Sequence, residues 1–208
     1  HALASEIQPE DGIILCGGDG TLNRFINDTA DIGFSNEILY YACGSGNDFC
    51  RDVEKMTGEC PFPINKYLEN LPLVTVKGKT YRFLDNVGFG IDGYCTLVGD
   101  KMRAQGKKNI NYAGIAIKGM LGGFHPVSAK VTVDGVTEEY KNVWLAPTMK
   151  GRYYGGGMMP TPAQRREDAD GKVSLMVFHK RSKLKTLMVF PSIFQGEHVR
   201  HKDMIAIR

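Results

Sequence analysis

Two short apolar runs are each followed directly by a glycine-rich loop. Residues 13–16 lead into Gly17-Gly18-Asp19-Gly20-Thr21, and residues 38–42 lead into Gly44-Ser45-Gly46-Asn47-Asp48. A continuous apolar run of this length is typical of a strand buried on both faces. Two successive strand–loop–helix units predict parallel strands whose loops open at the same sheet edge, where open α/β sheets bind ligands.

A helical pattern follows each loop. Leu22, Phe25 and Ile26 recur at helical spacing, with Thr21 as a capping hydroxyl, and a short helix is expected from Phe49 onward. This part of the chain predicts an α/β domain with a parallel sheet over residues 1–77, with a ligand site where the strands end.

From residue 73 the pattern changes to short strands and hairpins. Strands are expected at 73–76, 81–87, 129–133, 136–140, 143–146 and 173–178, and helices at about 93–104 and 111–121. Asp134-Gly135 is a strong signal for a two-residue hairpin turn. The run predicts a β-sandwich-like second domain over residues 78–208.

Composition excludes several protein classes. The 26 Lys and Arg against 23 Asp and Glu give a net charge of +3, too small to indicate a nucleic-acid partner. The five cysteines contain no C-x-x-C pair, so neither a disulfide framework nor a thiolate zinc site is expected, and free thiols fit a reducing cytoplasm. No run of 18 apolar residues is present to span a bilayer.

The two ends of the sequence suggest a fragment. The chain begins His1-Ala2-Leu3 without a methionine and ends at Arg208 in what reads as a strand. We therefore expect the first domain to be truncated at its N-terminus and the second at its C-terminus.

The first glycine loop, residues 17–21, combines features of a phosphate site. Backbone N–H groups at the start of a helix bind phosphate oxygens, and glycine permits their close approach. A capped turn is the simpler alternative. Because Asp19 would repel a phosphate unless a cation lay between them, the loop also predicts Mg²⁺.

Four motifs in order resemble the diacylglycerol kinase catalytic-domain family, which includes bacterial lipid kinases and is related to sphingosine kinases. Residues 17–23 (GGDGTLN) resemble a nucleotide signature shared with NAD kinases, whereas residues 44–49 (GSGNDF) resemble the lipid-kinase branch. The resemblance continues through residues 83–92 and through Gly155-Gly156-Gly157-Met158 with Pro160, Ala163 and Asp170-Gly171. It covers nearly the whole chain.

The resemblance implies ATP and Mg²⁺ as cofactors. It assigns the nucleotide to the two loops, through residues Gly17, Gly18, Asp19, Gly20, Thr21, Asn23, Gly44, Ser45, Gly46, Asn47 and Asp48. It makes Asp48 and Asp92 acidic members of the Mg²⁺–ATP site, and Asp170 a ligand of a structural Mg²⁺. From the residues alone Asp92 could instead cap a helix, and Asp170-Gly171 could be a turn.

Three features of the sequence bear on this assignment. Residues 88–93 spell G-x-G-x-x-G, but no parallel βαβ unit surrounds them, so a dinucleotide fingerprint is rejected. Arg24 stands where the family usually has glutamate, and no D-G-E follows late in the chain, where the family has a proposed general base. Asp19 is then the remaining candidate for the catalytic group that orients or deprotonates the acceptor.

The predicted function is ATP- and Mg²⁺-dependent phosphorylation of a lipid hydroxyl, such as that of diacylglycerol. The alternatives are an NAD kinase and a non-catalytic nucleotide- or lipid-binding module. A lipid substrate implies peripheral association with the inner membrane surface. Two basic stretches could provide it, residues 180–185 and residues 101–108, although a solvated surface is the simpler explanation. The sequence is compatible with a homodimer.

Overall fold

The computed structural model describes residues 6–107, 110–167, 170–180 and 182–208. The chain divides into two compact units. The first comprises residues 1–86, 150–157 and 164–173, and the second comprises residues 87–149, 158–163 and 174–208. The sequence predicts one boundary, at residue 77, whereas the chain returns to the first unit twice.

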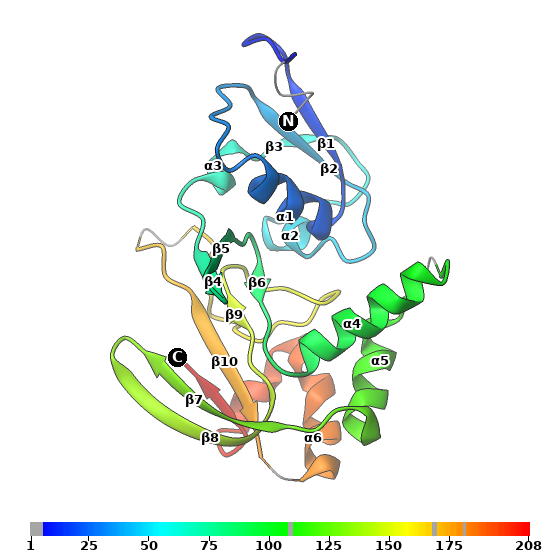
Figure 1. Cartoon of the computed structure of the whole chain (residues 1–208), viewed down its shortest axis with the longest axis vertical. Helices are drawn as coiled ribbons and strands as arrows, with labels where there is room; N and C mark the ends of the chain where they lie inside the picture. Colours follow the sequence, from blue (N-terminus) through cyan, green and yellow to red (C-terminus); the bar gives the residue numbers. More distant parts are fainter. Residues whose placement is uncertain (1–5, 108–109, 168–169, 181) are drawn as a thin grey trace. The chain divides into compact units, whose positions relative to one another are not determined.

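The first unit contains a three-stranded sheet in the order β1-β2-β3, with helix α1 beside it (Figure 1). Its elements are β1 (Ile13–Gly17), α1 (Asp19–Asp28), β2 (Ile38–Ala42), α2 (Asp48–Asp52), β3 (Phe62–Pro63) and α3 (Asn65–Leu68). β1 and β2 run parallel, with Ile13 opposite Ile38 and Gly17 opposite Ala42. The predicted parallel pair is therefore present, and both strands end at the glycine loops.

β3 makes this sheet mixed, because it pairs antiparallel with β2. Pro63 has no N–H to donate, and an edge strand tolerates that loss. The aromatic rings of Tyr40, Phe49 and Phe62 meet beneath the sheet, with Tyr40 and Phe49 fully buried. A separate hairpin, β4 (Leu73–Val76) with β5 (Lys79–Arg82), turns at Lys77-Gly78, where both residues have positive φ.

The larger sheet has six strands in the order β6-β9-β10-β8-β7, with β11 paired to β10. Its strands are β6 (Asn86–Val87), β7 (Val127–Val133), β8 (Val136–Leu145), β9 (Thr148–Met149), β10 (Ser174–His179) and β11 (Ile205–Ile207). Apart from Asn86 these strands belong to the second unit. The predicted hairpin turn at Asp134-Gly135 is confirmed, since both residues have positive φ.

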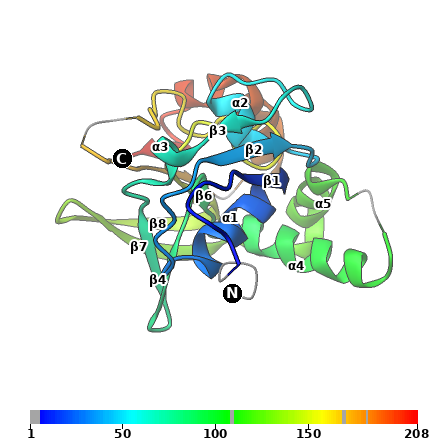
Figure 2. The ribbon, with the colours of Figure 1, turned by 90° about the horizontal axis from the view of Figure 1, so that it is seen from above.

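Helices occupy more of the second unit than the sequence analysis expected. α4 (Ile91–Ala104) and α5 (Tyr112–Lys118) pack against each other, and both views place them side by side (Figures 1 and 2). The sequence patterns do not predict α6 (Lys183–Val189), η3 (Phe190–Gln195) or η4 (Glu197–Arg200). The single helix expected at 111–121 is instead α5 followed by the π-helical turn η2 (Gly119–Gly123). No described helix is long and apolar enough to cross a bilayer.

Candidate active site

The first glycine loop turns directly from β1 into α1. Gly18 is extended, with φ −109° and ψ −173°, and its carbonyl accepts the N–H groups of Thr21 and Leu22 at 2.9 and 3.1 Å. The helix therefore begins at Asp19, and the expected cap at Thr21 is wrong. Thr21 lies within the first turn instead, and its side chain packs on Gly17, where a Cβ would lie 2.5 Å from Thr21 Oγ1.

The two glycine loops touch backbone to backbone. A Cβ on Gly18 would lie 2.9 Å from the Cα of Gly44, so a side chain at either position would force the loops apart. Asn47 holds the second loop: its Oδ1 accepts the Gly44 N–H at 2.9 Å and its Nδ2 donates to the Gly44 carbonyl at 2.8 Å. Asn47 is in the left-handed region at φ 51°, which asparagine tolerates better than most residues.

Asp19 links the first loop to the start of α2. Its Oδ2 accepts the N–H of Asp48 at 3.0 Å, and its Oδ1 accepts the N–H of Phe49 at 3.1 Å. These are the first two amides of α2, which have no partner within the helix. Asp19 thus has a structural role that the sequence pattern does not reveal. Its role as a catalytic base stays a prediction.

Asp48 is the second member of a carboxylate pair with Asp19. It is 4% exposed, and a Cβ on Gly46 would lie 3.2 Å from Asp19 Oδ2 and 3.5 Å from Asp48 Oδ2. Burial, joined by the charge of Asp19, raises the pKa of the Asp48 carboxyl, while the Gly156 amide opposes the shift. Because Gly46 has no side chain, both carboxylates can approach its Cα closely.

A third glycine segment, residues 155–157, completes the surroundings of this pair. The Gly156 N–H donates to Asp48 Oδ2 at 2.7 Å, across 108 positions of sequence. All three glycines have positive φ, and a Cβ on Gly157 would meet the Arg51 guanidinium. The glycine run was visible in the sequence, but its contact with Asp48 was not.

Arg51 provides a positive charge beside the carboxylate pair. The sequence motifs do not single out this residue. It lies on α2, its guanidinium stands 5.6 Å from the ring centre of Tyr153, and its charge acts to lower the pKa of Asp48. None of the acidic side chains described by the structure forms an ion pair with it. An exposed guanidinium in this position could bind phosphate oxygens.

An arginine network holds the two returning segments in the first unit. Asp52 Oδ1 accepts the backbone N–H and the Nε–H of Arg152 at 3.0 and 3.1 Å, and Asp52 Oδ2 accepts the Nε–H of Arg166 at 2.7 Å. Arg166 also donates to the Leu84 carbonyl at 2.6 Å and to Asp85. The network therefore attaches segments 150–157 and 164–173 to α2.

The residues fit a magnesium ion held by few protein ligands. Asp48 Oδ1 is buried and accepts no hydrogen bond from any described residue, and each Asp19 oxygen keeps a second lone pair. Mg²⁺ is usually held by one or two carboxylates, with phosphate oxygens and water in its other positions. No group of three or more His, Cys, Asp or Glu side chains suited to a metal occurs among the described residues.

The other predicted site residues are distributed over both units. Gly20, Thr21, Asn23 and Ser45 are exposed in the first unit, where a ligand could reach them. Asp92 belongs to the second unit, in the first turn of α4, and packs on the Cα of Gly88. Asp170 is 66% exposed and pairs with Lys172 at 2.9 Å, which lowers the pKa of Asp170; its neighbour Asp168 lies outside the described residues.

Two family descriptions together span most of the chain. "Diacylglycerol kinase catalytic domain" matches residues 1–73, and "YegS C-terminal NAD kinase beta sandwich-like domain" matches residues 85–208. The second match agrees with the β-sandwich-like domain expected from the sequence.

Similar proteins carry related names. The protein "Diacylglycerol kinase" of Mycobacterium tuberculosis strain H37Rv is 24% identical over 216 residues, which are 100% of this chain and 68% of that protein. "Putative lipid kinase YtlR" of Bacillus subtilis strain 168 is 22% identical over 209 residues, covering 90% of this chain and 64% of that protein.

A solved structure shares the fold. The crystal structure of "a putative diacylglycerol kinase" from Bacillus anthracis str. Sterne has a TM-score of 0.62 and 20% identity. The match covers 100% of this chain and 66% of the Bacillus anthracis chain. The predicted family and its lipid-kinase enzyme class are confirmed: this chain belongs to the diacylglycerol kinase catalytic-domain family.

Proposed function

We propose that the protein containing this chain is an ATP- and Mg²⁺-dependent lipid kinase that phosphorylates a hydroxyl such as that of diacylglycerol. The acceptor oxygen attacks the γ-phosphorus of ATP, the bond from that phosphorus to the β–γ bridging oxygen breaks, and ADP leaves. The hydroxyl proton passes to a base, for which Asp19 is the candidate. The names of the relatives support the lipid as substrate class.

The observation that carries the proposal is the carboxylate pair enclosed by three glycine segments. The backbone N–H of Asp48 donates to the Asp19 carboxylate, and the backbone N–H of Gly156 donates to the Asp48 carboxylate. Phosphoryl transfer needs positioning and charge stabilisation more than covalent chemistry. A buried acidic pair beside glycine backbone suits that task.

Each part of the site has a proposed role. The backbone N–H groups of Asp19 and the exposed Gly20, at the start of α1, would bind phosphate oxygens, with Arg51 adding positive charge. Asp48, with Asp19, would hold Mg²⁺, which supplies charge neutralisation for the phosphates when bound. The metal roles of Asp92 and Asp170 stay predictions.

A phosphorylation assay with a mixed panel of acceptors tests the function. The full-length protein is incubated with γ-labelled ATP, Mg²⁺, mixed micelles of several lipids, and NAD⁺ in separate reactions. We expect one lipid to be labelled, and Asp48→Asn to lose at least about a hundredfold in rate, a typical cost of removing one charge-stabilising group. Asp31→Asn, an exposed aspartate outside the site, is the matched control and keeps its rate.

The same assay separates the alternatives. Labelling of NAD⁺ alone would establish an NAD kinase, and ATP binding without any labelled acceptor would establish a non-catalytic module. Either result contradicts the lipid-kinase proposal.

We also propose that α6 contributes to peripheral membrane association. Leu184 and Met188 lie one turn apart and are 68% and 63% exposed, and the exposed cations Lys183 and Lys185 flank them.

Of the other predicted cations, Lys180 pairs with Asp203, Arg103 pairs with Asp100, and Arg181 and Lys108 lie outside the described residues. Apolar side chains beside lysines suit an anionic bilayer, at ~1 kcal/mol per charge near the surface.

Vesicle flotation tests this association. Lys183→Glu/Lys185→Glu is expected to weaken binding to phosphatidylglycerol-containing vesicles, whereas Lys130→Glu/Lys141→Glu on the strands β7 and β8 is the control. Unchanged binding of the α6 variant would remove the proposal and leave the kinase proposal intact.

A further inference from the structure

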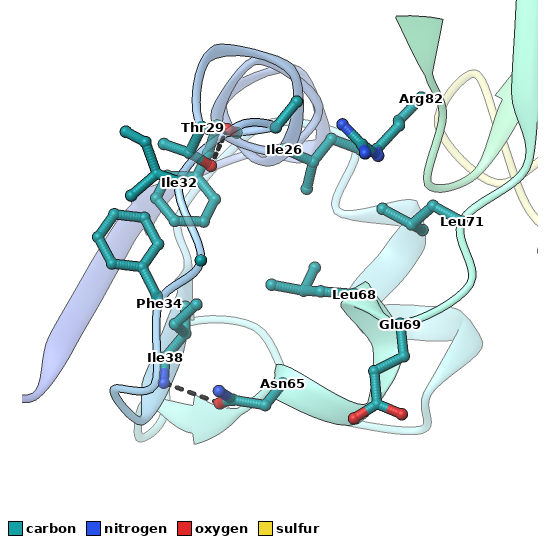
Figure 3. A pocket seen from close by; sticks show the side chains of 13 residues that line it. Ile26, Thr29, Ile32, Phe34, Ile38, Asn65, Leu68, Glu69, Leu71 and Arg82 are labelled. Atoms are coloured by element: carbon teal, nitrogen blue, oxygen red, sulfur yellow. Dashed lines mark hydrogen bonds between the residues drawn. The ribbon is translucent and has the colours of Figure 1, made fainter. Parts of the chain in front are cut away.

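The first unit contains a pocket of about 320 Å³ that none of the predicted site residues lines. It lies among the end of α1, the segment that follows α1, the start of β2, α3 and the end of β5 (Figure 3). The apolar side chains of Ile26, Ile32, Phe34, Ile38, Leu68 and Leu71 form much of its wall. Its volume is at the lower end of the ~300–1,000 Å³ range of small-molecule sites.

Two polar residues that line the pocket are already engaged within the protein. Thr29 donates its hydroxyl to the Phe25 carbonyl at 2.7 Å. Asn65 accepts the Ile38 N–H at 2.8 Å and donates to the Asn36 carbonyl at 2.8 Å. Neither side chain needs a ligand, so the chemistry offered to a ligand is set by the apolar wall and by the two charged lining residues, Arg82 and Glu69.

Arg82 brings a positive charge to this pocket. Its backbone N–H and carbonyl both bond to the Asn27 side chain, at 2.9 Å each, which fixes Arg82 against α1. Figure 3 shows its guanidinium directed toward the cavity. Within the described part of the chain no carboxylate pairs with it, and the Glu69 carboxylate at the rim points away from it (Figure 3).

The pocket is separate from the candidate active site. It abuts Ile38, the first residue of β2, whereas the second glycine loop follows Ala42, the last residue of that strand. Likewise it uses Phe25, Ile26 and Thr29 at the far end of α1, while Asp19 begins that helix.

We propose that this Arg82 pocket binds a small carboxylate with an unbranched apolar tail, of the class of medium-chain fatty-acid anions. A guanidinium pairs with a carboxylate through two parallel hydrogen bonds, and the apolar wall takes the tail out of water. The opposite charges select the anion, and the tail selects against short carboxylates such as acetate. This site would be additional to the sites for the nucleotide and the lipid acceptor, so it goes beyond the proposed function.

Calorimetric titration of the full chain with decanoate, below its micellar concentration and without nucleotide or lipid, tests the proposal. We expect saturable binding of one decanoate, with acetate and decanol binding at least about tenfold more weakly. Arg82→Gln is expected to reduce decanoate affinity at least about tenfold, because a hydrogen bond between charged groups is lost. Arg165→Gln, an exposed arginine of the same unit outside the pocket, is the matched control.

A second variant keeps the charge and fills the space. Leu68 points into the cavity in Figure 3, and Leu68→Phe is expected to weaken decanoate binding without removing Arg82. Equal affinities for decanol and decanoate, or unchanged affinity in both variants, would overturn the assignment. Because no phosphoryl transfer is measured, this result is independent of the kinase assay.

Discussion

Arg166 donates its Nε–H to Asp52 Oδ2 at 2.7 Å, although 114 positions of sequence separate the two residues. Their side chains are 7% and 2% exposed, and the Arg166 guanidinium also lies 4.9 Å from the ring centre of Phe49. This ion pair therefore attaches segment 164–173 to α2, directly behind the helix start that carries Asp48.

Removing Arg166 should destabilise the first unit strongly. In Arg166→Met the buried carboxylate of Asp52 loses one of its partners, and the expected loss is about 3–5 kcal/mol of unfolding free energy. Urea unfolding measures it, with the exposed neighbour Arg165→Met as the control, expected to change stability by less than about 0.5 kcal/mol. Equal effects of the two substitutions would show that the ion pair is not a stability determinant.

Asp48→Asn should separate metal binding from folding. Burial raises the pKa of Asp48, so its ionised form weakens the fold at neutral pH, and the neutral amide is expected to unfold no earlier than the parent without Mg²⁺. Mg²⁺ at ten times its Kd should stabilise the parent by about 1.4 kcal/mol and the variant by much less. Thermal unfolding with and without Mg²⁺ measures both. An equal Mg²⁺ response would place the metal elsewhere.

Two glycine substitutions should have opposite effects on stability. In Gly44→Ala the new Cβ would lie 3.0 Å from the Gly18 nitrogen and closer still to its Cα, so we expect a loss of about 1–3 kcal/mol. Gly20→Ala meets no atom within 4 Å and lies in α1, so it should gain up to about 1 kcal/mol.

Gly20→Ala should nevertheless bind ATP more weakly, because its methyl group narrows the phosphate approach. Chemical denaturation measures the stability and nucleotide titration measures the ATP affinity. Gly12→Ala is the control, because a Cβ at Gly12 also meets no atom within 4 Å. A variant that is more stable and binds ATP as well as the parent would remove Gly20 from the site.

His198 should make stability fall in mild acid. It is fully buried, its Nε2 lies 2.7 Å from the Pro160 carbonyl, and burial lowers its pKa. Because the folded-state pKa lies below the unfolded value, near 6.5, stability is complete above about pH 6.5 and is lost as the pH falls below it. His198→Gln should flatten this slope in unfolding experiments between pH 7.5 and 5, whereas the exposed His201→Gln should retain it.

Local patterns predicted the elements that surround the site. The apolar runs before each glycine loop predicted β1 and β2 as a parallel pair, and Asp134-Gly135 predicted the turn between β7 and β8. The start of α1 was placed too late, because the packing of Thr21 on Gly17 is not visible in a capping pattern. Helix α6 was missed because its apolar residues were read only as the continuation of a basic stretch.

The sequence by itself determined the family, the two glycine loops and the acidic residues within them, because each depends on residue types at short, fixed spacings. Only the tertiary structure decided that Gly156 bonds to Asp48, that Arg166 holds Asp52, and that Arg82 faces an apolar pocket. The first two contacts join residues that are 108 and 114 positions apart, and Asn27, which holds the Arg82 backbone, is 55 positions from Arg82. Which distant groups meet depends on how the whole unit packs and closes its loops, and no local pattern encodes that choice.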